Sequence, residues 1–143
     1  MMEEIQRAIL IDDEKIDHRL YRKVMHRSGL VRELECFVYA DEALDHLRLN
    51  RDAAIDVIFL DINMPRMNGF EFLDALKAEM PERLAMSAVV MLTTSTDPMD
   101  RARAEASGCV SAFLNKPLCV EDVQHIALCL RALWQPGNLK AAV

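Results

Sequence analysis

A short apolar run that ends in an acid constrains the fold of this chain more than any other feature. Most of residues 54–60 are β-branched or large and apolar, and the run stops at Asp61. A run this short and this apolar is typical of a strand buried on both faces, as in a parallel sheet. Pro65 and the pair Asn68-Gly69 predict a turn soon afterwards. Asp61 is therefore expected at the carboxyl end of an interior strand, the edge where open α/β sheets bind ligands.

The same kind of run recurs along the chain, and helical patterns separate the runs. The other expected strands cover residues 8–11, 34–38, 88–92 and 110–114, and the expected helices cover residues 16–28, 40–47, 72–80, 97–108 and 120–134. This alternation predicts a doubly wound α/β fold, (βα)5 in chain order, in which helices cover both faces of a five-stranded parallel sheet. We expect one domain over residues 1–143, with its core at residues 7–134 and a C-terminal tail at 135–143.

The first helix carries a regular apolar pattern. Ile16, Leu20 and Val24 recur every four residues, with Tyr21 and Met25 beside them. This spacing is typical of an amphipathic helix, so these residues are expected to pack against the sheet.

The fourth helix is expected to be anchored more weakly. Asp97 or Thr96 would cap it, and Pro98 suits its first turn. Its apolar face is thin and consists of Met99, Ala102 and Ala106. A helix with so few apolar contacts is suited to move between two positions.

Charge and hydropathy exclude several classes of partner. The net charge is -6 and the Lys and Arg residues form no cluster, which argues against nucleic-acid binding. No apolar stretch approaches the roughly 20 residues of a membrane helix, and the acidic N-terminus does not resemble a signal peptide. The four cysteines have no zinc-site spacing and are interpreted as reduced thiols. We therefore expect a cytoplasmic protein.

Polar residues follow four of the expected strands, and the carboxyl ends of parallel strands share one edge of a sheet. Asp12 and Asp13 follow the first strand, Asp61 the third, Thr93 the fourth and Lys116 the fifth. Three neighbouring carboxylates repel one another unless a cation neutralises them, and Mg²⁺ prefers oxygen ligands. An amine and a hydroxyl beside them would bind phosphoryl oxygens. The set predicts a magnesium-dependent phosphoryl-transfer site in which Asp61 is the nucleophile.

Each of these residues also has an ordinary structural interpretation. Asp12 and Asp13 would serve as helix caps, and Asp61 as a turn residue. Thr93 suits a strand, and Lys116 would be a solvated surface lysine. Their joint position at the strand ends favours the functional interpretation. The histidines have no metal-ligand spacing and are interpreted as surface or satisfied residues: His18, His26, His46 and His125.

Together these motifs resemble the receiver domain of bacterial two-component response regulators. The matching residues are Asp12-Asp13, Asp61 with Met64-Pro65 and Gly69, Thr93, and Lys116-Pro117, and the match extends over about residues 7–134. The resemblance implies a flavodoxin-like fold with strand order 2-1-3-4-5. It also implies specific roles: Asp61 accepts the phosphoryl group; Asp12, Asp13, Asp61 and the backbone carbonyl of Asn63 bind Mg²⁺; Thr93 is the switch hydroxyl; Lys116 contacts the phosphoryl group; and the peptide bond before Pro117 is cis.

The resemblance also assigns a second switch residue. Phe113 lies three residues before Lys116, where the family has its switch aromatic, often a tyrosine. A phenylalanine lacks the tyrosine hydroxyl, and a plain core residue of the fifth strand is the alternative interpretation. The expected output surface is formed by the fourth helix, the fifth strand and the last helix. It would meet a downstream protein or a second copy of this chain.

The resemblance implies a stand-alone receiver in a phosphorelay. Its phosphodonor would be a sensor histidine kinase or a phosphotransfer protein, and it would catalyse only its own phosphorylation and dephosphorylation. Three alternatives stay open. A phosphatase of the haloacid-dehalogenase type would need an acid at the position of Asn63, and an FMN-binding protein would need a first loop less acidic than Asp12-Asp13-Glu14. A receiver-like scaffold that is never phosphorylated is the third.

Overall fold

Runs of β-branched and large apolar residues form five parallel strands in the computed structural model, which describes residues 4–130. They are β1 (Ile5–Ile11), β2 (Val31–Phe37), β3 (Val57–Leu60), β4 (Ala88–Thr93) and β5 (Ala112–Asn115). Their order in the sheet is β2-β1-β3-β4-β5, which confirms the predicted flavodoxin-like fold. All residues of β3 and β4 are buried, as expected of interior strands of a parallel sheet.

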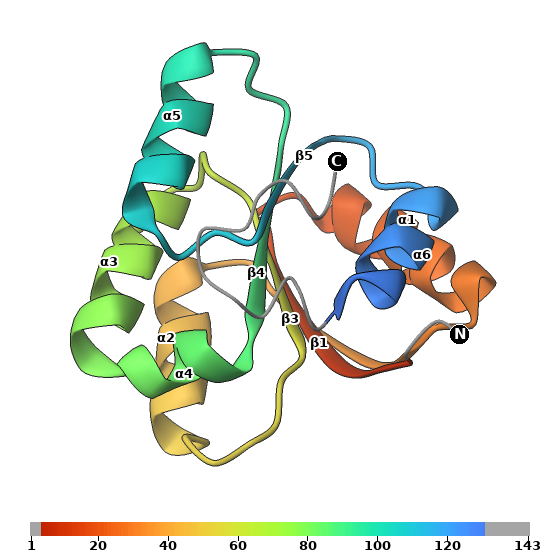
Figure 1. The fold of residues 1–143 in the computed structure, drawn as a ribbon, viewed down its shortest axis with the longest axis horizontal. Helices are drawn as coiled ribbons and strands as arrows, with labels where there is room; N and C mark the ends of the chain where they lie inside the picture. Colours follow the sequence, from red (N-terminus) through yellow and green to blue (C-terminus); the bar gives the residue numbers. More distant parts are fainter. Residues whose placement is uncertain (1–3, 131–143) are drawn as a thin grey trace.

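Within residues 4–130, six helices cover the two faces of this sheet (Figure 1). They are α1 (Lys15–Ser28), α2 (Ala40–Leu49), α3 (Gly69–Glu79), α4 (Pro81–Met86), α5 (Pro98–Ser107) and α6 (Val120–Leu128). The buried residues of α1 and α6 pack in one apolar cluster, and those of α2, α3 and α5 pack in another on the opposite face. No helix within residues 4–130 has the length and apolarity to cross a membrane. The predicted end of the last helix at Trp134 and the tail at 135–143 lie outside the described residues.

Helix α4 was not predicted from the sequence. Pro81 was expected to end the third helix, and α3 does end before it, but Pro81 also occupies the first turn of α4. Within α4, Arg83 is only 1% exposed, and its guanidinium donates hydrogen bonds to three carbonyl oxygens of the loop before β3. The acceptors are Ala53 at 2.7 Å, Arg51 at 3.0 Å and Asn50 at 3.2 Å. The expected fourth and last helices are therefore α5 and α6.

The predicted buried face of α1 is wrong in part. Tyr21 and Met25 are buried, but Ile16 is 75% exposed and Leu20 is 42% exposed. The helix carries two adjacent apolar stripes, and the sheet and α6 cover the stripe of Tyr21 and Met25. The other stripe leaves apolar side chains on the surface beside the carboxyl ends of the strands.

The predicted anchors of α5 are also wrong. Met99 is 71% exposed, and Ala102 and Ala106 are exposed as well, whereas Ala104 is the buried residue of this helix. Two arginines on α5 attach it to aromatic rings instead. Arg101 lies 5.5 Å from the ring centre of Phe113 on β5, and Arg103 lies 4.3 Å from that of Phe70 on α3. Long arginine stems and cation–π attraction thus supply contacts that an apolar face would otherwise provide.

Candidate functional site

The sheet register brings the strand-end acids together. Ile11 of β1 is paired with Leu60 of β3, so the next residues, Asp12 and Asp61, leave the sheet side by side. The backbone N–H of Asp61 donates to the Ile11 carbonyl at 3.0 Å and continues the ladder. Oxygen atoms of Asp12, Asp13 and Asp61 all lie within 4.8 Å of one another. Asp12 is 1% exposed and Asp61 is 7% exposed, so two of these acids are held away from water.

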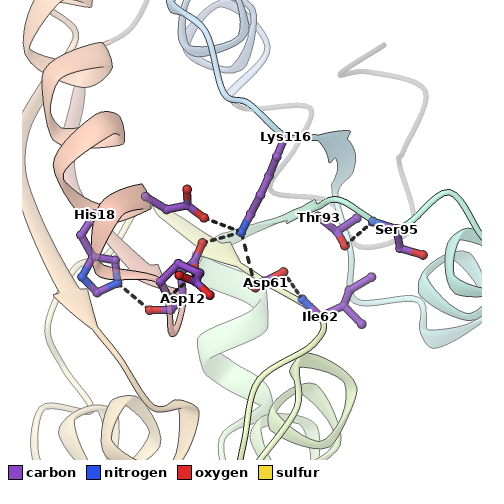
Figure 2. Close-up of polar contacts among 9 residues, drawn as sticks. Asp12, His18, Asp61, Ile62, Thr93, Ser95 and Lys116 are labelled. Atoms are coloured by element: carbon purple, nitrogen blue, oxygen red, sulfur yellow. Dashed lines mark hydrogen bonds and ion pairs between the residues drawn. The ribbon is translucent and has the colours of Figure 1, made fainter.

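Lys116 enters this acidic cluster from the end of β5 (Figure 2). Its Nζ atom donates to Asp12 Oδ2 at 2.7 Å and to Asp17 Oδ2 at 2.8 Å, and lies 3.5 Å from Asp61 Oδ2. Burial opposes the ammonium charge, but the hydrogen bonds and charges of the three acids outweigh burial and raise the pKa of Lys116. The amine is thus a fixed positive charge in the site. The peptide bond between Lys116 and Pro117 is cis.

The surroundings of Asp12 and Asp61 disfavour the ionised form of both carboxyl groups. Burial raises the pKa of Asp61 to about 6 against the opposing charge of Lys116, and the charge of Asp12 adds to the rise. Burial likewise raises the pKa of Asp12, although hydrogen bonds from Lys116 and Glu14 oppose it. A second cation beside Lys116 would relieve this repulsion.

The donor atoms fit a hard divalent cation. Every ligand offered by Asp12, Asp13 and Asp61 is a carboxylate oxygen, which is the donor type that Mg²⁺ prefers at about 2.1 Å. Asn63 lies in the loop between β3 and α3, and the assignment of its carbonyl as a ligand stays a prediction.

The loop after Asp61 is held close to the start of α3. The backbone N–H of Ile62 donates to Asp61 Oδ1 at 2.8 Å, and the N–H of Gly69 donates to the Ile62 carbonyl at 2.8 Å. A Cβ atom on Gly69 would lie 2.4 Å from the carbonyl oxygen of Asp61. Only glycine permits this approach, so the Asn68-Gly69 turn can pack directly against the backbone of Asp61.

Thr93 links the site to α5. It is the last residue of β4 and fully buried, and Figure 2 shows it on the opposite side of Asp61 from Asp12. Its Oγ1 accepts a hydrogen bond from the Ser95 N–H at 3.0 Å, and the Ser95 hydroxyl donates to Asp100 Oδ2 of α5 at 2.5 Å. Phe113 lies on β5, buried beneath Arg101. Thr93 and Phe113 are thus each connected to the same helix, Thr93 through Ser95 and Phe113 through Arg101.

The structure does not support a capping role for the first two acids. Glu14 occupies the N-cap position of α1, and Asp12 Oδ1 accepts the Glu14 N–H at 2.9 Å.

Two neighbours of the site were not identified from the sequence. Asp17 bonds to Lys116, and a ring nitrogen of His18 donates to the Asp12 carbonyl at 2.5 Å. Both lie in α1 just after the strand-end acids, and that position was the available signal.

Comparison with known proteins gives consistent matches. Residues 8–128 match the family model of the response regulator receiver domain. The chain is 32% identical to the probable methanogenesis regulatory protein FilR2 of Methanothrix harundinacea, over 91% of this chain and 84% of that protein. It is 29% identical to the two-component response regulator ORR1 of Oryza sativa subsp. indica, over 92% of this chain but 58% of that protein. A solved two-component response regulator from Cytophaga hutchinsonii has a TM-score of 0.84 and 30% identity, covering 91% of this chain and 99% of that chain.

Proposed function

This chain belongs to the response regulator receiver domain family, and we propose that it accepts a phosphoryl group on Asp61 from a histidine kinase or a phosphotransfer protein. The observation that carries the proposal is the convergence of Asp12, Asp13 and Asp61 with Lys116 at one edge of the sheet. Family members use such an acidic pocket for phosphorylation, and a pocket of this charge has no evident structural purpose.

Asp61 would act as the nucleophile through the oxygen that faces Lys116. Its Oδ1 atom accepts the Ile62 N–H, whereas Oδ2 lies 3.5 Å from the Lys116 ammonium. Attack of a carboxylate oxygen on phosphohistidine forms the O–P bond of an aspartyl phosphate and breaks the N–P bond, and the imidazole takes up a proton. Lys116 would then donate to a phosphoryl oxygen.

Magnesium held by Asp12, Asp13, Asp61 and the Asn63 carbonyl would neutralise negative charge on the phosphoryl oxygens. Lys116 would supply a further positive charge from the end of β5. The acids thus bind the ion, and the amine orients the group that is transferred. These assignments of individual ligands are part of the proposal.

Thr93 would couple phosphorylation of Asp61 to a movement of α5. A threonine hydroxyl can accept one hydrogen bond while it donates another. Thr93 can therefore donate to a phosphoryl oxygen and keep the bond that it accepts from the Ser95 N–H. Movement of Thr93 toward Asp61 would therefore pull on Ser95 and on its partner Asp100 in α5. Phe113 would follow into the space that Thr93 leaves, and its contact with Arg101 would transmit that movement to the same helix.

Two surfaces are suited to protein partners. The exposed apolar residues Ile16 and Leu20 on α1 lie beside the acidic edge and would contact the phosphodonor. The face of α5, β5 and α6, which includes the exposed Met99, would contact a downstream protein or a second copy of the chain. A cytoplasmic location follows from the proposed exchange with a histidine kinase.

The test is incubation with Mg²⁺ and acetyl phosphate, followed by mass spectrometry of the intact protein and its peptides. We expect one phosphoryl group per chain, on the peptide that contains Asp61. Asp61→Asn should stay unmodified, and the surface change Asp52→Asn should react like the wild type. An unmodified wild type, or a phosphoryl group on another residue, would refute the proposal.

A further inference from the structure

The Lys116 ammonium is held by an acid that lies outside the predicted magnesium cluster. Asp17 is in the first turn of α1, and its Oδ2 accepts a hydrogen bond from Lys116 Nζ at 2.8 Å. The two side chains are largely buried, with 21% of Asp17 and 10% of Lys116 exposed. A charge-assisted bond this short and this shielded from water fixes the position of both groups.

We propose that Asp17 is a positioning residue for phosphoryl transfer, because it holds the Lys116 ammonium beside Asp61 and keeps it there while the other acids bind the metal ion. The inference rests on the proposed function and adds a residue to those proposed for that site. Asp17 does not touch the reacting atoms, and it acts through Lys116.

The distances show how the ammonium is divided among its partners. A lysine has three N–H donors, and those of Lys116 are directed at Asp12 at 2.7 Å, Asp17 at 2.8 Å and Asp61 at 3.5 Å. The two shorter bonds hold the ammonium just beyond hydrogen-bond contact with the nucleophile. If Asp17 lost its charge, the ammonium would lose one of its two short bonds, and it would no longer be held at a fixed position for a phosphoryl oxygen.

Asp17 differs from the other two partners in one respect. Asp12 and Asp61 belong to the group of oxygens that fits Mg²⁺, whereas Asp17 does not. A bound divalent cation weakens the attraction of its own ligands for a neighbouring ammonium. Asp17 is then the partner that continues to hold Lys116 in place for a phosphoryl oxygen.

A purely structural role for Asp17 is the alternative. An acid in the first turn of a helix stabilises that helix by interaction with its dipole, and any such acid would do this. Glu42 provides a matched control, since it is exposed and lies in the first turn of α2. The two interpretations differ in whether the effect of Asp17 depends on Lys116.

The experiment compares phosphorylation rates with acetyl phosphate at saturating Mg²⁺. We expect Asp17→Asn to react on the order of tenfold more slowly than the wild type, and Glu42→Gln to stay within about twofold. In a Lys116→Ala background, followed over a longer time course, Asp17→Asn should cause no further decrease. Thermal unfolding of each variant shows whether the fold is intact.

A second measurement requires neither metal nor phosphorylation. In metal-free protein, the ¹H–¹⁵N NMR signal of the Lys116 ammonium should be visible in the wild type and in Glu42→Gln, because two short bonds slow its exchange with water. It should broaden beyond detection in Asp17→Asn.

The outcomes separate the two levels of the argument. A wild type that takes up no phosphoryl group refutes the proposed function, whatever Asp17 does. A wild type that reacts, with Asp17→Asn equally fast and its ammonium signal retained, refutes the inference and leaves the proposed function standing. An equal loss of rate with and without Lys116 also refutes the inference, because Asp17 would then act on the fold.

Discussion

Replacement of Asp61 by asparagine is expected to stabilise the metal-free protein by an amount that depends on pH. Burial raises the pKa of Asp61 from 3.8 to about 6. Between these values the folded protein retains a proton that the unfolded chain has lost, so the free energy of unfolding falls as pH rises through this window. The window spans about two pH units at about 1.4 kcal/mol each, so above it the ionised carboxylate costs the fold about 3 kcal/mol. The variant lacks this cost, and its amide oxygen can still accept the Ile62 N–H.

Urea denaturation with EDTA at several pH values between 4 and 8 measures the effect. The two proteins should have similar unfolding free energies near the usual pKa of 3.8, and the variant should be more stable by about 3 kcal/mol above about pH 6. Saturating Mg²⁺ should narrow the difference, because the ion binds the folded wild type. Asp52→Asn is the control and should give a difference that does not change over this range. A difference that is constant with pH, or an asparagine variant less stable than the wild type at neutral pH, would refute the reasoning.

Three further changes test other contacts at the site and in the helices. Arg83→Met removes a guanidinium that bonds three carbonyls, and we expect a loss of about 2–4 kcal/mol in urea denaturation; an unchanged midpoint would contradict its anchoring role. Gly69→Ala places a methyl group 2.4 Å from the Asp61 carbonyl, so unfolding free energy should fall by about 1–3 kcal/mol and phosphorylation should slow. Asp97→Ala removes the cap that accepts the Met99 N–H at 2.9 Å, and amide exchange should increase in α5 but stay unchanged in α3, with a local loss of about 1 kcal/mol.

Much of the acidic edge could be predicted because its geometry follows from a simple pattern. Short, fully apolar runs identify interior parallel strands, and residues that follow such strands must meet at one edge. This rule alone places Asp12, Asp61 and Lys116 at one edge of the sheet. The order of the strands could be predicted only from the resemblance to the receiver family, because apolar runs identify strands but do not indicate which strands are neighbours in the sheet.

Two of the errors share a physical cause, which is that a helix can rotate about its own axis. In α1, both the Ile16–Leu20 stripe and the Tyr21–Met25 stripe fit the periodicity, and tertiary packing selects between them. For the same reason the contact of Asp17 with Lys116 could not be predicted, since it depends on how α1 is rotated about its own axis. Helix α5 was misjudged because arginine stems were not counted as anchors. Pro81 was interpreted only as the end of a helix, although it suits a first turn equally well.

The charges in the pocket connect its stability with its chemistry. Lys116 pairs with Asp12, Asp17 and Asp61, and Asp13 lies beside Asp12 and Asp61, so four carboxylates and one ammonium leave a net charge of -3 when all are ionised. Burial makes this imbalance unfavourable, and sequences selected for stability alone would remove it. A divalent cation would offset most of this charge, so part of the energy that destabilises the metal-free fold would become affinity for the ion. Because the ion would offset the charge of Asp12 and Asp61, the position of Lys116 would then depend most on Asp17, which lies outside the cluster. The stability measurements on Asp61→Asn and the rate measurements on Asp17→Asn thus test two consequences of one charge distribution.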